Sequence, residues 1–245
     1  MASTFNQTRH ADAAAVLRRY LADRTEDGIN ATDPPGLRLK KRVLHQRLRF
    51  PLRLVATTLQ RPLAALKLRR LRRQKPLQLN LGSGYNPKRG WVNVDLLGAP
   101  VDLAWDLTSG IPLPDASVDA IYHEHMLEHL SLRQGFELCR ECHRALRPGG
   151  ILRIAVPNAG TLLNSYAGNF DSTWVDAVPT PMLAVNALFY DAGHRTMYDG
   201  DLLVMLLNAA GFRSAWVSEF GSTDLRPLPD DPDRRDGTLF VEAAR

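Results

Sequence analysis

The chain has 245 residues, of which 44% are hydrophobic and 23% are charged. These values are typical of a soluble globular protein with one sizeable core and room for an appended segment. No run of about 18 apolar residues occurs, so we expect no transmembrane helix. The first 24 residues lack a basic region followed by an apolar one, so we expect no secretory signal. Two cysteines, Cys139 and Cys142, fit a reducing, cytoplasmic location.

The charge of the chain is unevenly distributed. Residues 35–94 contain sixteen Lys or Arg and no Asp or Glu, whereas the remainder carries fifteen basic and twenty-six acidic residues. A basic block of this density indicates attraction to something anionic, which could be a membrane surface, a nucleic acid, a phosphorylated substrate or an acidic partner.

The first 75 residues read as a basic helical N-terminal extension. Apolar residues at helical spacing predict a helix over 9–24, and the Pro- and Gly-containing stretch 25–36 reads as a linker. In 37–75, Leu, Val and Phe alternate with Arg and Lys, and two prolines divide the stretch into short helical pieces.

Three roles remain open for the basic segment 37–75. Its leucines could enter an anionic membrane surface, or the segment could pack on the rest of the chain or on a protein partner. It could also contact nucleic acid phosphates. Phe50 is the only aromatic residue between residues 37 and 75, so base stacking is the least favoured role.

Residues 76–245 read as one α/β domain. Short apolar or β-rich segments predict strands at 77–81, 91–95, 101–106, 118–122, 151–156, 212–219 and 238–243. Helical spacing predicts helices at 132–146 and 201–210. This alternation indicates a mostly parallel, seven-stranded sheet with helices on both faces, in which the last two strands form an antiparallel hairpin at an edge.

A glycine turn directly follows the first predicted strand. Gly82 and Gly84 allow the backbone to turn sharply and to approach a ligand closely, although a plain turn is equally compatible with two glycines. Asp95 and Asp106 end the next two strands, where carboxylates could accept ribose hydroxyls and meet an adenine edge. Three strand ends thus predict one site at the carboxyl rim of the sheet.

Several stretches together resemble the class I S-adenosylmethionine-dependent methyltransferases. They are LNLGSG, WVNVD, LAWDLTSGIPLPDASVDAIYHEHMLEHL and RALRPGGILRIAVPN. The resemblance implies a Rossmann-like fold and S-adenosyl-L-methionine as cofactor. The cofactor-binding residues that it implies are Asn80, Gly82, Gly84, Asp95, Leu96, Asp106, Leu107 and His125.

The stretches GWVNVD, HMLEHL and HRTMYD are similar to a bacterial, type 11-like subgroup of predicted methyltransferases. Some members of this subgroup look linked to genes for cell-surface polysaccharide biosynthesis. Two positions depart from the wider family, which often has Asp where Asn80 stands and Gly where Asn86 stands. An oxygen or nitrogen of a small-molecule or glycan-type acceptor is the methyl acceptor that we expect.

Methyl transfer mainly needs alignment of the nucleophile, the methyl group and the sulfur. A hydroxyl acceptor would also benefit from a general base, and the catalytic candidates are His125 and His194. His129 reads more readily as a helix cap. His123 reads equally well as a buried, hydrogen-bonded residue. Residues 157–199 mix aromatic and polar groups and could either bind the acceptor or cover the sheet.

Other chemistries fit the sequence less well. Cys139 and Cys142, one helical turn apart, read as core-facing thiols, and we expect no metal site. The sequence lacks the nucleoside-triphosphate motif GxxxxGK[ST] and the dinucleotide motif GxGxxG. It also lacks the hydrolase motif GxSxG. Two alternatives stay open, namely a non-catalytic scaffold with the same fold and a nucleic-acid methyltransferase that uses the basic segment. A peripheral position at the inner face of the membrane would follow from lipid binding.

Overall fold

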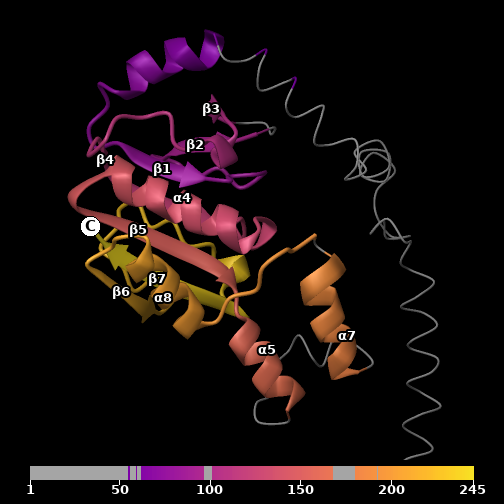
Figure 1. Ribbon diagram of the computed structural model, residues 1–245. Helices are drawn as coiled ribbons and strands as arrows, with labels where there is room; N and C mark the ends of the chain where they lie inside the picture. The colour runs from indigo at the N-terminus through magenta and orange to yellow at the C-terminus, as the bar shows by residue number, and fades with distance from the viewer. Residues whose placement is uncertain (1–54, 56–58, 60–61, 97–100, 168–179, 192) are drawn as a thin grey trace, which may run out of the picture. The chain divides into compact units, whose positions relative to one another are not determined.

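The computed structural model describes residues 55, 59, 62–96, 101–167, 180–191 and 193–245. The predicted helix 9–24 and the linker 25–36 lie outside these residues. The chain divides into two compact units, Arg53–Gly160 with Gly193–Arg245, and Met1–Leu52 with Thr161–Ala192. The first of these contains the whole sheet (Figure 1).

The sheet has seven strands in the order β3-β2-β1-β4-β5-β7-β6. Their bounds are Gln78–Leu81 (β1), Val92–Asp95 (β2), Leu103–Ala104 (β3), Val118–Glu124 (β4), Leu146–Pro157 (β5), Ser214–Ser218 (β6) and Thr238–Ala244 (β7). Strands β1 to β5 are parallel, and β7 runs antiparallel to both β5 and β6. The predicted mostly parallel sheet and the hairpin at its edge are therefore confirmed.

One face of the sheet is covered by helices. Helices α4 (Leu132–Ala145) and α8 (Gly200–Ala209) lie in front of the sheet in Figure 1. Alternate strand residues such as Leu79, Ile121 and Ile154 form a single buried cluster with these two helices and with a helix over residues 62–71. Alternation of this kind places every second side chain of a strand on the same face.

The two cysteines of α4 lie in this core, as predicted. Cys139 and Cys142 are fully buried, and desolvation raises the pKa of Cys139 to about 12. Helix α4 begins with a capping box, in which Ser131 and Gln134 satisfy each other's backbone N–H groups. The predicted cap, His129, is therefore wrong, because it lies in the preceding 3-10 turn η2 (Leu127–His129).

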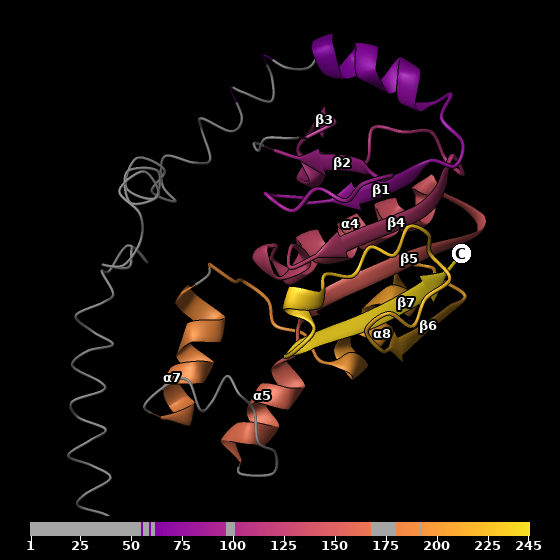
Figure 2. The ribbon, with the colours of Figure 1, turned by 180° about the vertical axis from the view of Figure 1, so that it is seen from behind.

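The opposite face is covered by a loop. Figure 2 shows the chain between β6 and β7 crossing this face. Phe220 and Leu225 belong to a second, smaller cluster with Trp91, Tyr122 and Phe240. Within the sheet-containing unit, α4, α8 and the helix over residues 62–71 pack in the cluster on the first face. The connection from β1 to β2 has ten residues, 82–91, fewer than the dozen or more that a helical crossover needs.

The helix over residues 62–71 belongs to the sheet-containing unit, since Ala64 and Leu68 are buried in its core. The predicted division into 1–75 and 76–245 stays a prediction.

The second unit contains most of α5 (Ala159–Tyr166), together with α7 (Pro181–Asn186) and a π-helical turn, η3 (Ala187–Asp191). None of the helices in the described residues is both long and apolar enough to cross a membrane.

Candidate functional site

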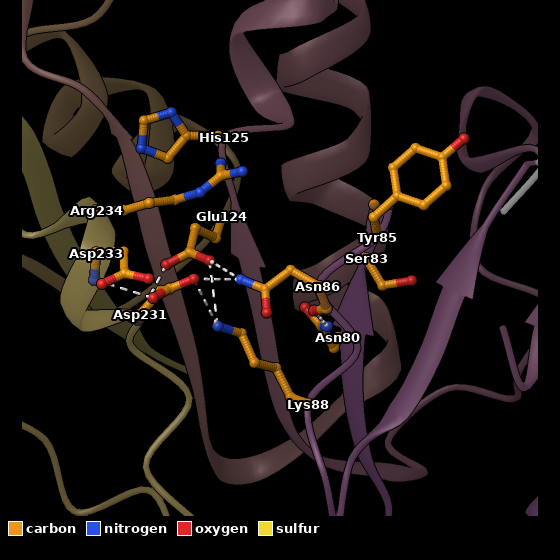
Figure 3. A pocket seen from close by; sticks show the side chains of 12 residues that line it. Asn80, Ser83, Tyr85, Asn86, Lys88, Glu124, His125, Asp231, Asp233 and Arg234 are labelled. Carbon is orange, nitrogen blue, oxygen red and sulfur yellow. Dashed lines mark hydrogen bonds and ion pairs between the residues drawn. The ribbon is translucent and has the colours of Figure 1, made fainter. Parts of the chain in front are cut away.

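A cavity of about 460 Å³ opens at the carboxyl ends of β1 and β4 (Figure 3). Its size is typical of a small-molecule site. Three parts of the chain line it: the end of β1 with the glycine turn and Lys88, the end of β4, and the loop between β6 and β7. The lining residues are Asn80, Gly82, Ser83, Gly84, Tyr85, Asn86, Lys88, Glu124, His125, Asp231, Asp233 and Arg234.

The glycine turn has a backbone that only glycine adopts easily. Gly82 and Gly84 have φ values of +67° and +52°. A β-carbon on Gly82 would overlap the side chain of Met126, whereas Gly84 borders open space. Asp95 holds the turn, because its carboxylate accepts a hydrogen bond from the Gly84 N–H at 2.8 Å. The carboxylate also accepts from the N–H of the next residue, Leu96, at 2.6 Å.

The turn also presents a polar atom that lacks a partner. The Ser83 hydroxyl is buried, lines the cavity and makes no hydrogen bond with any residue that the structure describes. Buried polar groups are nearly always satisfied, so this hydroxyl indicates that a ligand completes the site. Together with the open space beside Gly84, it shows that the turn fits a polar ligand.

Asn80 and Asn93 hold the loop that follows the turn. The Asn80 side chain donates to Asn93 Oδ1 at 2.9 Å, and Asn93 Oδ1 also accepts from the Lys88 N–H at 2.7 Å. Because Asn80 is already used in this way, the departure from the family's Asp has a structural role in the loop. Asn86, the second departure, donates to Glu124 at 3.2 Å and also to Asp231.

The wall opposite the turn carries charges of both signs. Glu124 accepts hydrogen bonds from Tyr122 at 2.7 Å, from Lys88 at 3.2 Å and from the N–H of Asp231 at 3.2 Å. None of the wall residues Lys88, Glu124, Asp231, Asp233 and Arg234 was predicted. The position of Glu124 at the end of a strand could have predicted it as a site residue. Nothing in the sequence marks the loop residues Asp231, Asp233 and Arg234 as such.

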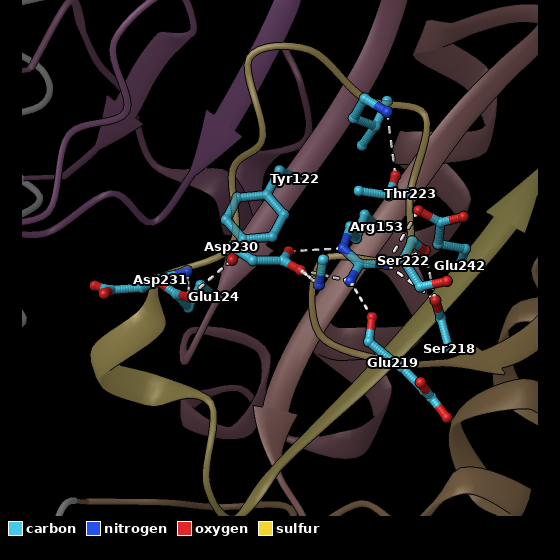
Figure 4. Close-up of polar contacts among 12 residues, drawn as sticks. Tyr122, Glu124, Arg153, Ser218, Glu219, Ser222, Thr223, Asp230, Asp231 and Glu242 are labelled. Atoms are coloured by element: carbon cyan, nitrogen blue, oxygen red, sulfur yellow. Dashed lines mark hydrogen bonds and ion pairs between the residues drawn. The ribbon is translucent and has the colours of Figure 1, made fainter.

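A buried ion network holds the loop that delivers Asp231 and Arg234 (Figure 4). Arg153 on β5 is fully buried and donates to both carboxylate oxygens of Asp230, at 2.7 and 2.6 Å. It also donates to Glu242 at 3.1 Å. Paired in this way, Arg153 joins the loop to the face of the sheet.

His125 is the predicted catalytic residue that lines the cavity. It is a non-glycine residue with φ of +48°, a strained conformation that often marks a functional position. Its Nε2 lies 3.1 Å from Thr238 Oγ1, and its Nδ1 lies 3.6 Å from Glu128 Oε1. Burial, and then the charge of Arg234, lower the pKa of His125 to about 4, so its ring is neutral at neutral pH.

The second predicted catalytic residue, His194, meets the same carboxylate. Its Nε2 lies 3.9 Å from Glu128 Oε1, and its ring packs edge-on against His129, with centroids 4.9 Å apart. Burial raises the pKa of Glu128 to about 8. The structure thus brings His125, His129 and His194 together around a buried glutamate that was not predicted as a site residue.

The remaining predicted residues lie elsewhere. Asp106 caps the 3-10 turn η1 (Leu107–Ser109) by accepting from the Thr108 N–H at 2.9 Å, and Leu107 is buried. These two residues, like Asp95 and Leu96, are not among those that line the cavity. His123 is buried as predicted, but neither ring nitrogen has a hydrogen-bond partner in the described chain, and burial lowers its pKa to about 3.

Comparisons with known proteins agree with the motifs. Residues 93–154 match a family model described as a methyltransferase domain. A probable S-adenosylmethionine-dependent methyltransferase of Mycolicibacterium smegmatis is 41% identical over 58 residues, which are 24% of this chain and 22% of that protein. One from Mycobacterium tuberculosis is 32% identical over 96 residues, or 38% and 34% of the two chains.

The chain therefore spans about a fifth to a third of the length of these curated relatives. A crystal structure of an S-adenosylmethionine-dependent methyltransferase from Archaeoglobus fulgidus is 17% identical over 74% of this chain and 94% of that one, with a TM-score of 0.45. The sequence matches confirm the predicted resemblance to the S-adenosylmethionine-dependent methyltransferases.

Proposed function

We propose, from the relationship of residues 93–154 to S-adenosylmethionine-dependent methyltransferases, that this protein transfers a methyl group from S-adenosylmethionine. The observation that carries the proposal is the glycine turn, which places an unpartnered Ser83 hydroxyl in a cavity at the carboxyl ends of β1 and β4. In parallel α/β sheets, this rim is where ligands bind.

The chain's own residues would bind and orient the reactants. S-adenosylmethionine, when bound, supplies a methyl group that its sulfonium already activates. Ser83 and the backbone of Gly82 and Gly84 would contact the donor, and Asp95 would accept its ribose hydroxyls with the lone pairs that its two backbone contacts leave. Holding donor and acceptor in line is the main catalytic contribution expected of these groups.

The acceptor that suits the cavity is polar. Lys88, Glu124 and Asp231 surround the cavity with hydrogen-bonding groups, which favours an oxygen or nitrogen of a sugar-like or other polar small molecule. His125 faces the cavity with a neutral ring and is the residue that we propose contacts the acceptor.

Changing Ser83 to Ala is expected to weaken S-adenosylmethionine binding about three- to tenfold, because one neutral hydrogen bond is lost. Isothermal titration calorimetry would measure this change. Ser109→Ala, which alters an exposed serine outside the cavity, is the matched control and should bind like the unchanged protein.

Two outcomes would contradict this picture. Absence of any heat or thermal shift at millimolar S-adenosylmethionine would rule out the donor. Tight binding without methyl transfer to polar acceptors, followed with a tritium-labelled methyl group, would favour the non-catalytic scaffold instead.

We also propose that the helix over residues 62–71 lies at an anionic membrane surface on the cytoplasmic side. Leu63 and Leu66 are 62% and 63% exposed, although Ala64 and Leu68 of the same helix are buried in the core. Exposed basic residues accompany the two leucines, namely Lys67, Arg69, Arg70, Arg72 and Arg73. An exposed apolar stripe beside basic residues is the pattern by which amphipathic helices bind anionic lipid.

Changing Leu63 and Leu66 together to Ser is expected to reduce binding to vesicles of phosphatidylcholine and phosphatidylglycerol at least about tenfold, since each inserted Leu contributes roughly 1.5–3 kcal/mol. Vesicle co-sedimentation would measure it, and Met205→Ser, an exposed site on α8, is the control. Equal sedimentation of both variants would refute lipid insertion. Salt-sensitive RNA binding with no vesicle binding would favour the nucleic-acid alternative.

A further inference from the structure

Glu128 is a buried carboxylate in an unusual setting. Its side chain has no exposed surface, and neither oxygen has a hydrogen-bond partner among the described residues. The nearest polar groups are ring nitrogens, with His125 Nδ1 at 3.6 Å and His194 Nε2 at 3.9 Å from Oε1. A buried acidic group without a hydrogen bond is costly, so something else must satisfy it.

The two ring nitrogens of His125 have different neighbours. The Thr238 hydroxyl donates its single proton to the carbonyl oxygen of Arg234, so it accepts at His125 Nε2. The other ring nitrogen, His125 Nδ1, lies 3.6 Å from Glu128 Oε1. A proton or a cation beside Glu128 Oε1 would satisfy the carboxylate.

The cluster is held in place from outside. The carbonyl oxygen of Glu128 accepts hydrogen bonds from the N–H groups of Arg195 at 2.8 Å and Thr196 at 3.2 Å. The Thr196 hydroxyl donates to the Leu130 carbonyl oxygen at 2.9 Å. These contacts bring His194 to Glu128 across 66 residues of chain, and such supporting bonds are what orient the ligands of a metal site.

We propose that Glu128, His129 and His194 bind a divalent first-row transition-metal ion. One ligand atom from each of the three lies within 4.8 Å of the others. Ligands around tetrahedral zinc lie roughly 3.4 Å apart, so modest side-chain movement would close the site. Two imidazoles and one carboxylate suit zinc, iron, cobalt or nickel rather than magnesium or calcium, which prefer oxygen ligands alone.

The position of the site gives the ion access to the cavity. His129 is exposed, which provides a route from solvent, and His125 both lines the cavity and lies 3.6 Å from Glu128. An ion bound with three protein ligands has coordination positions left for a polar acceptor group. This proposal replaces the expectation from the sequence that the chain has no metal site, and it does not depend on methyl transfer.

The test uses the full-length protein, stripped with a chelator and titrated with Co²⁺ or Zn²⁺ in the absence of S-adenosylmethionine. We expect calorimetric binding of Zn²⁺, and visible absorption bands for bound Co²⁺ that indicate nitrogen and oxygen ligands. Glu128→Gln and His194→Asn should each weaken this binding at least about tenfold.

Two further variants keep the result interpretable. His129→Asn changes an exposed side chain and tests the same site if the buried variants fail to fold. His143→Asn changes a histidine on α4 that packs against Phe212, outside the cluster, and should bind metal as the unchanged protein does. Absence of metal binding to the unchanged protein, or binding that persists equally in His129→Asn and His194→Asn, would overturn the proposal.

Discussion

Replacing Asp95 with Ala is expected to lower the affinity for S-adenosylmethionine by more than about a hundredfold. A carboxylate that accepts both ribose hydroxyls makes two charge-assisted hydrogen bonds, each contributing about 1.5–3 kcal/mol. The same substitution also removes the acceptor for the Gly84 N–H, which holds the turn, and for the Leu96 N–H. Isothermal titration calorimetry with purified protein would measure the change.

Two controls separate these contributions. Asp95→Asn keeps one oxygen acceptor and should lose less affinity than Asp95→Ala. Asp115→Ala removes a carboxylate that is 74% exposed and pairs with Arg144, so its affinity should not change. If Asp95→Ala bound S-adenosylmethionine as tightly as Asp115→Ala, the proposed role of Asp95 would be wrong.

Replacing Arg153 with Met is expected to lower the free energy of unfolding by about 3–5 kcal/mol. Asp230 and Arg153 have fully buried side chains, and that of Glu242 is 8% exposed. Removing the cation leaves two carboxylates in the interior without a counter-charge, which costs far more than the packing that Met restores. Urea denaturation followed by circular dichroism would measure the difference.

The matched control is Arg147→Met. The Arg147 side chain is 58% exposed and pairs with Asp119 at 2.9 Å, so its removal should cost no more than about 1 kcal/mol. A combined replacement of Arg153, Asp230 and Glu242 by apolar residues should recover much of the stability lost in Arg153→Met. Equal destabilisation by Arg153→Met and Arg147→Met would show that the network does not hold the loop.

The Arg153→Met variant also tests how the loop between β6 and β7 is held beside the cavity. Asp230 accepts from Arg153 and from the Gly221 N–H at 2.7 Å, and its neighbour Asp231 reaches the cavity. Loss of Arg153 should therefore increase amide hydrogen exchange in the loop residues 219–234 more than in the strands of the sheet.

The amino-acid sequence by itself determined the sheet and half of the site. Strand periodicity and the glycine turn depend on neighbours within a few residues, so patterns in the chain predict them. For the same reason, Gly82, Gly84 and Asp95 were predicted at one rim. The ten-residue connection between β1 and β2 is too short for a helical crossover, and this length can be read from the sequence once the two strands are placed.

Only the tertiary structure decided which distant polar groups meet. Glu124 joins Asp231 across 107 residues, and Arg153 joins Asp230 across 77. Glu128 meets His194 because the backbone N–H groups of the following residues bond to the Glu128 carbonyl oxygen. A charged residue in a sequence looks the same whether it is solvated or buried, because long-range packing alone determines its solvent exposure and its partner.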